Sequence, residues 1–166
     1  MAEKELILKE KVQSAGIFSY SGYYSFAYAW LRYEDYDVIE EEYIESVSGN
    51  EKDITIKWKA WKQLSDYFKI EHAIKTEVRG MSDVEVEIDG VKKKMNKGKI
   101  TVEIKGSMVR DPDSEWHGGW GWRFFRGVYD KYVIPGRIKE MRDKIREEVR
   151  LFKEQLKSYL ELSGRR

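Results

Sequence analysis

The chain has 166 residues, and its 31 basic and 30 acidic residues leave a formal net charge of +1. This length is typical of one globular domain, and the charge balance argues against a globally basic nucleic-acid-binding protein. Cysteine is absent, so disulfide bonds and cysteine nucleophiles are excluded. Lysine and glutamate dominate the charge, as in heat-adapted proteins. We expect one cytoplasmic, thermostable domain over residues 1–166, with no cofactor.

Residues 12–31 carry no charge and match the length of a membrane-spanning helix. Serines, tyrosines and two glycines dilute their hydrophobicity, however. The preceding residues alternate acid and base, unlike the basic start of a signal peptide. We therefore expect no transmembrane segment.

The first elements are a strand and a helix. "ELILKEKV" predicts a strand with Leu6, Leu8 and Val12 on one face and Glu10 in the same apolar row. The next apolar side chains recur at helical spacing and predict one helix or two short ones. They are Tyr20, Tyr23, Tyr24, Ala27, Trp30 and Leu31.

From Asp37 onward the apolar residues alternate with a period of two, which predicts strands. Ile39, Tyr43 and Val47 form one predicted row. Three further rows run from Ile54 to Ala60, from Phe68 to Val78 and from Ile100 to Met108, each opposed by charged residues. Asp89-Gly90 predicts a hairpin, and "NKG" at 96–98 predicts a second turn. The pattern indicates an antiparallel sheet of six or seven strands with one apolar face.

The last third predicts helices: one over about 122–133, a kink or break at Pro135-Gly136, and a long terminal helix. The apolar stripe of that terminal helix is Ile138, Met141, Ile145, Val149, Phe152, Leu156 and Tyr159. The predicted class is therefore α+β, and we expect the three strand rows to face the terminal helix. The order of elements resembles the helix-grip fold of START-type and lipid-transfer proteins. That resemblance implies a curved sheet that holds the helix around an apolar cavity.

Four segments resemble an uncharacterised family of small archaeal proteins with no assigned activity. They are "SDYFK", "DGVKKKMNKG", "IKGSMVRD" and "FFRGVYDKYVI". This resemblance covers nearly the whole chain and implies an archaeal protein, but it brings no catalytic or binding residues.

The leading functional hypothesis is a non-enzymatic binding module that holds a small apolar molecule between the sheet and the terminal helix. The candidate cavity residues are Tyr23, Tyr24, Trp30, Trp58, Phe68, His72, Trp120 and Trp122. An alternative is a structural, self-assembling or protein-binding component without a ligand. A weaker alternative is a hydrolase or cyclase in which Glu10 orients His72 as a general base.

"DPDSEWHGGWGW", residues 111–122, is the most unusual segment. Asp111, Asp113, Glu115 and His117 alternate, yet their spacing matches neither a calcium loop nor a zinc motif, so we expect no metal site. The tryptophans among glycines predict a buried structural plug, with a cavity lid and a partner surface as alternatives. Trp61 beside Lys57 and Lys59 fits a solvated charged face better than a nucleic-acid site, because neighbouring glutamates cancel the field.

Overall fold

The computed structural model describes residues 3–65, 67–110 and 134–164. In these residues five strands and two helices follow one another as β1 (Glu3–Phe18), α1 (Tyr20–Tyr33), β2 (Asp37–Ser48), β3 (Glu51–Gln63), β4 (Phe68–Ile88), β5 (Val91–Arg110) and α3 (Ile134–Gly164). The predicted helix over 122–133 and the segment 111–122 lie outside the described residues.

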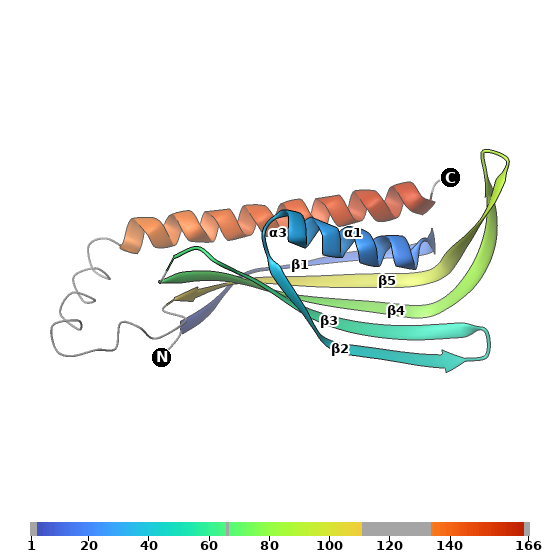
Figure 1. The fold of residues 1–166 in the computed structure, drawn as a ribbon, viewed down its shortest axis with the longest axis horizontal. Helices are drawn as coiled ribbons and strands as arrows, with labels where there is room; N and C mark the ends of the chain where they lie inside the picture. The colour runs from blue at the N-terminus through green and yellow to red at the C-terminus, as the bar shows by residue number, and fades with distance from the viewer. Residues whose placement is uncertain (1–2, 66, 111–133, 165–166) are drawn as a thin grey trace.

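The described strands form one antiparallel sheet in the order β1-β5-β4-β3-β2. The predicted α+β class is therefore confirmed, but these strands number five instead of six or seven. The sheet is not strongly curled, and both helices lie on one face of it (Figure 1). The described part of the molecule consequently has two layers, with its apolar core between them.

Each helix covers a different half of the sheet. α3 lies along β1 and β5. α1 covers the other half, because its Tyr23 hydroxyl is 2.8 Å from the Thr76 hydroxyl of β4 and its Tyr24 ring meets the Trp58 ring of β3 edge-on. The expectation that all three strand rows face the terminal helix is thus corrected, because α1, between β1 and β2, covers part of the same face.

The predicted apolar rows are confirmed as the inner face of the sheet. The rows of β3, β4 and β5 are buried along their length, and the α3 stripe belongs to the same core. The stripe residues that are almost fully buried are Ile145, Val149, Phe152 and Leu156, joined by Leu160. Burial of this apolar surface is the main force that holds the helices on the sheet.

The uncharged residues 12–31 are divided between a strand and a helix. β1 continues to Phe18, and α1 starts after Ser19, whose side-chain oxygen accepts a hydrogen bond from the Gly22 amide at 3.1 Å. The tyrosine-rich segment is thus one helix rather than two. Among the described residues, no helix has the length and apolar character needed to cross a membrane.

Two bulges change which side chains face the core. The β1 register shifts between Leu6 and Leu8, so Leu6 pairs with Ser107 on the outer face and is 55% exposed. The β2 register shifts between Glu40 and Glu42, so Ile39 faces outward. Placing Leu6 and Ile39 in the apolar rows was wrong, because one extra residue moves every side chain beyond it to the opposite face.

The hairpin between β4 and β5 extends beyond both neighbouring strands. Asp89 and Gly90 both have positive φ, 52° and 79°, which confirms the predicted turn. β3 pairs with β4 only as far as Met81, and β1 pairs with β5 only from Asn96. The tip, 82–95, therefore projects from the sheet and bends toward the helical side (Figure 1).

The predicted turn at "NKG" is wrong, because these residues lie within β5. Gly98 serves a different purpose there. A β-carbon on Gly98 would come within 3.0 Å of the Arg79 carbonyl and the Met81 α-carbon, at the point where β4 carries a bulge. Glycine thus permits a close backbone approach inside a long strand.

Candidate functional site

The candidate cavity residues that the structure describes are buried or half-buried, and most of them pack against other aromatic rings. Trp30 stacks on Phe152 with ring centroids 4.5 Å apart, and Tyr24 packs against Trp58 at 5.0 Å. Phe68 meets Tyr67 edge-on at 5.0 Å. Trp120 and Trp122 lie outside the described residues. The described members therefore occupy the sheet–helix contact and form its packing.

His72 lies in a buried polar cluster with Tyr36, Glu148 and Lys62. Its Nε2 atom is 2.9 Å from the Tyr36 hydroxyl, which donates a hydrogen bond to Glu148. The Lys62 ammonium is 3.7 Å from Glu148 and 4.6 Å from the centre of the Tyr36 ring. His72 and Tyr36 are 3% and 0% exposed. The cluster joins four parts of the chain, namely β3, β4, α3 and the segment between α1 and β2.

The hydrogen-bond pattern assigns roles within this cluster. Since the Tyr36 hydroxyl donates to Glu148, its oxygen accepts from His72, which places a hydrogen on Nε2. Nδ1 has no hydrogen-bond partner among the described residues. A β-carbon on Gly106 would lie 3.2 Å from Nδ1 and 2.5 Å from a Val149 methyl. Gly106 therefore lets α3 approach the sheet closely over His72.

The cluster favours the carboxylate form of Glu148. Burial disfavours its charge, but His72, the Tyr36 hydroxyl and the Lys62 ammonium outweigh this effect and lower the pKa of Glu148. Burial, with the neighbouring Glu148 charge, raises the pKa of Tyr36. The hydrogen bonds and the ion pair of this cluster link α3 to the sheet.

Glu10 has a different partner from the one the sequence predicts. It faces α3 and accepts a hydrogen bond from Lys153 at 3.1 Å, while Arg142 binds Glu5 in the same way at 2.8 Å. β5 separates Glu10 on β1 from His72 on β4. The acid next to His72 is Glu148, and Glu5 and Glu10 bind α3 along β1.

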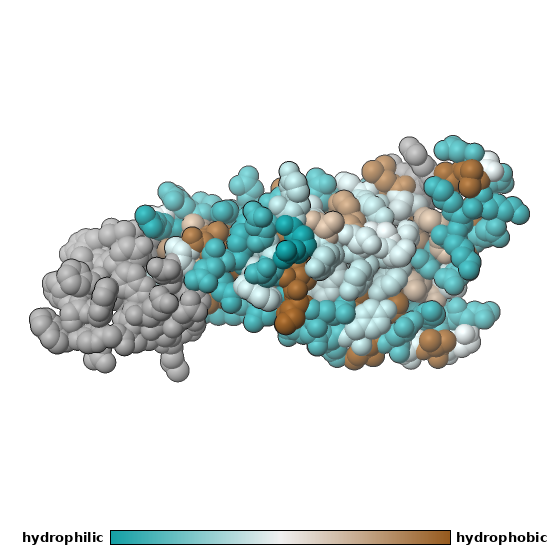
Figure 2. Space-filling model, in the orientation of Figure 1, coloured by the Kyte–Doolittle hydropathy of each residue, from teal (hydrophilic) through white to brown (hydrophobic). Residues whose placement is uncertain are grey.

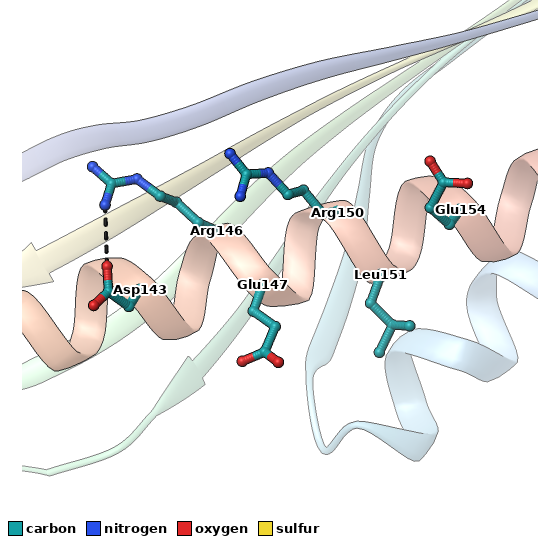
Figure 3. Close-up of a pocket in the computed structure, with 6 residues that line it drawn as sticks. All are labelled: Asp143, Arg146, Glu147, Arg150, Leu151 and Glu154. Atoms are coloured by element: carbon teal, nitrogen blue, oxygen red, sulfur yellow. Dashed lines mark hydrogen bonds and ion pairs between the residues drawn. The ribbon is translucent and has the colours of Figure 1, made fainter.

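A hollow of about 520 Å³ lies on the outward side of α3 (Figure 3). Its lining comes from this one helix and consists of Asp143, Arg146, Glu147, Arg150, Leu151 and Glu154. Arg146 is 3.2 Å from Asp143. In the figure the two arginines point away from Glu147 and Leu151, so the polar groups do not converge on one point.

A second hollow, about 290 Å³, lies over the outer face of the sheet. Three lysines reach it, but each has a carboxylate nearby: Lys57 with Glu42 at 3.0 Å, Lys75 with Glu77 at 2.9 Å, and Lys105 with Glu103 at 3.5 Å. Trp61 is half-buried on this face, with Lys69 over its ring. The lysines are balanced by carboxylates, which gives this face little attraction for a polyanion.

The edge strand β2 exposes apolar side chains on both of its faces. Ile39 and Ile44 face outward, whereas Tyr43 and Val47 lie on the helical side, and Val47 is 63% exposed. Figure 2 shows apolar surface along the lower margin of the molecule, over β2. β2 forms one end of the sheet, so its outer row of backbone amides and carbonyls has no neighbouring strand in the described residues.

β2 is also strongly acidic. It carries Asp37, Glu40, Glu41, Glu42 and Glu45, and no basic residue. Glu40 accepts hydrogen bonds from Tyr24 at 2.9 Å and from Trp58 at 3.1 Å, which fixes it on the helical face. Glu42 lies on the opposite face beside Lys57. The acidic strand therefore presents negative charge on both faces of this sheet edge.

The remaining candidates are residues that could bind a metal ion. Among the described residues, no three His, Asp or Glu side chains gather in a way that would hold a metal ion. Asp111, Asp113, Glu115 and His117 lie outside the described part of the chain.

Sequence reasoning overlooked the partners of His72. Lys62 offered a signal, because it continues the apolar row of β3 and a lysine in that row needs a buried counter-charge. Tyr36 and Glu148 gave no comparable signal, since they reach His72 only through the packing of α3 on the sheet.

Comparison with protein-family models, with curated proteins and with solved structures finds no match for this chain.

Proposed function

We propose that the protein is a non-enzymatic protein-interaction module that binds a basic, extended segment along β2. The supporting observation is the edge of the sheet itself. One strand there combines exposed apolar side chains, negative charge and backbone groups that have no neighbouring strand among the described residues. An extended segment added to such an edge gains main-chain hydrogen bonds, and its alternate side chains meet those of the edge strand.

The negative charge of β2 favours a positively charged partner strand. Residues directly opposite each other on neighbouring strands interact, so opposite charges stabilise the pair and like charges destabilise it. Two β2 strands from different copies would bring glutamates against glutamates. β2 therefore disfavours pairing with itself and favours a strand that carries lysine or arginine between apolar residues. This acidity also protects the free edge against indiscriminate aggregation.

The test is the binding of a synthetic peptide that alternates lysine with valine, measured by fluorescence anisotropy at low and high salt. We expect binding that weakens as salt rises, because the attraction is electrostatic. Replacing Glu41→Lys together with Glu42→Lys should weaken binding about tenfold or more. A peptide that alternates glutamate with valine should not bind.

The matched control carries the same change in net charge elsewhere, with Glu147→Lys and Glu154→Lys on the exposed side of α3. It should bind the peptide as the native protein does. If the native protein does not bind the lysine–valine peptide, β2 is not the binding edge. The same conclusion follows if the substitutions in α3 weaken binding as much as those in β2.

The other functional hypotheses stay predictions. An apolar ligand would have to enter among aromatic rings that now contact one another, such as Trp30 and Phe152. A hydrolase or cyclase would have to use His72, which is 3% exposed. The likeness to the helix-grip fold, and to the archaeal family, likewise stays a prediction.

A further inference from the structure

We infer that the segment bound by β2 is the hairpin tip of a second copy of this chain, so that the protein assembles with itself through two different surfaces. This inference rests on the proposed function, because it names the partner of the same edge. Its two surfaces are the β2 run "IEEEY", Ile39 to Tyr43, and the hairpin run "VKKKM", Val91 to Met95.

The two runs have the same arrangement with opposite charge. Each places three consecutive charged residues between two apolar ones, so aligning them in either direction sets glutamates opposite lysines and apolar residues opposite apolar residues. Both strands also carry charge on both of their faces. The bulge in β2 places Glu40 and Glu42 on opposite faces, whereas Lys92 and Lys94 share one face of β5 and Lys93 lies on the other, so the two runs match in charge and not in the order of their faces.

The hairpin run has a free edge. β1 pairs with β5 only from Asn96 onward, so along 91–95 the side of β5 that faces away from β4 has no neighbouring strand in the described residues. Val91 is 57% exposed, and the lysines that follow it are exposed. In the described part of the chain no carboxylate lies within ion-pair distance of Lys92, Lys93 or Lys94.

The shape of the molecule makes the tip accessible. Figure 1 shows the hairpin bending away from the sheet, and Figure 2 shows apolar atoms at its end. A surface hollow of about 690 Å³ lies between the turn from β2 to β3 and the base of the hairpin, lined by Val47, Lys52 and Ser82 among others. The formal net charge of +1 adds little overall repulsion between copies.

Pairing of two different surfaces has a geometric consequence. Such an interface closes into a symmetric pair only if each copy offers both surfaces to the other at once, and otherwise it extends into a ring or chain of copies. The same contact therefore serves as the unit of a larger assembly.

The experiment measures assembly of the full chain by sedimentation velocity across a concentration series at low salt. The native protein should self-associate, and salt should reverse this. One variant carries Glu41→Lys and Glu42→Lys, and another carries Lys92→Ser, Lys93→Ser and Lys94→Ser. For each variant alone, the self-association constant should fall about tenfold or more, so that the variant sediments as a monomer where the native protein associates. Circular dichroism and a cooperative melt confirm that each variant is folded.

Mixing the two variants gives the decisive result. The first retains its lysine tip and the second retains its acidic edge, so one interface can form between them. An equal mixture should contain complexes of two chains and nothing larger. A third variant that exchanges the charges, with Glu41→Lys, Glu42→Lys, Lys93→Glu and Lys94→Glu, should regain association with itself.

A native protein that stays monomeric, or a serine variant that associates as the native protein does, overturns the inference. If the lysine–valine peptide still binds β2 in that case, the proposed function stands and only the identity of its partner is wrong. If the peptide also fails to bind, both fall.

Discussion

The buried cluster around His72 and the acidic edge around Glu41 use the same residue types to different effect. Within the cluster, Glu148 lies among Tyr36, His72 and Lys62, and these partners satisfy its charge. Along the edge, the glutamates of β2 lie in solvent or bind neighbouring side chains of the sheet and of α1, and the outer backbone row has no partner in the described residues. The first region fastens a helix to the sheet, and the second is open to another chain.

The role of a charged side chain in a strand depends on which element covers it. Glu5 and Glu10 lie on the helical face of β1 and bind Arg142 and Lys153 of α3. Glu41 lies at the bulge of β2 and is exposed. Polar groups under α3 therefore serve stability, whereas polar groups on β2 are available for recognition.

The largest effect should come from removing a side chain in the covered region. Phe152→Ala should lower the free energy of unfolding by about 3–5 kcal/mol, since the ring is 2% exposed and stacks on Trp30. The adjacent Leu151→Ala should change it by less than about 1 kcal/mol, because Leu151 is 48% exposed. Urea denaturation followed by circular dichroism measures both. Equal losses would show that α3 does not bury the face described.

A smaller effect, dependent on pH, should come from the buried cluster. The pKa of Glu148 is lowered in the folded protein, so its contribution to stability is present above the unfolded-state pKa of about 4.3 and is lost as pH falls through the lower folded-state value. Glu148→Gln should therefore destabilise the protein at pH 7, by about 1–3 kcal/mol. The difference from the native protein should shrink steadily below pH ~4.

Denaturation curves at several pH values check this expectation. A difference that stays constant from neutral to acidic pH would mean that the Glu148 charge contributes nothing, and that the substitution acts through packing. Glu147→Gln on the next residue, which is exposed, provides the control.

The smallest effect on stability should come from the edge. Glu41→Lys with Glu42→Lys should change the free energy of unfolding by less than about 1 kcal/mol, because the Glu42–Lys57 pair lies in solvent-exposed surroundings. The same variant should lose most of its peptide binding. Thermal melts at matched salt concentration measure the change in stability. A loss comparable to that of Phe152→Ala would mean that β2 contributes to the core rather than offering a free edge.

The sequence by itself determined the classes of element and most of the core. Alternation of period two placed Ile54 to Ala60 and Phe68 to Val78 on the buried face, and helical spacing defined the α3 stripe from Ile145 to Leu156. These features are local, because the periods of strand and helix depend on neighbouring residues alone. Asp89-Gly90 belongs with them, since its backbone conformation is set by the two residues of the turn.

Only the tertiary structure decided the bulges, the partners and the free edges. Leu6 and Ile39 left the predicted rows because a single extra residue in β1 and in β2 shifts the pairing with the next strand. Gly98 resembled a turn residue but accommodates the β4 bulge. Glu148 became the neighbour of His72, and "IEEEY" became a sheet edge, through contacts between segments far apart in the chain. Such contacts depend on how the elements pack, and local periodicity carries no information about that packing.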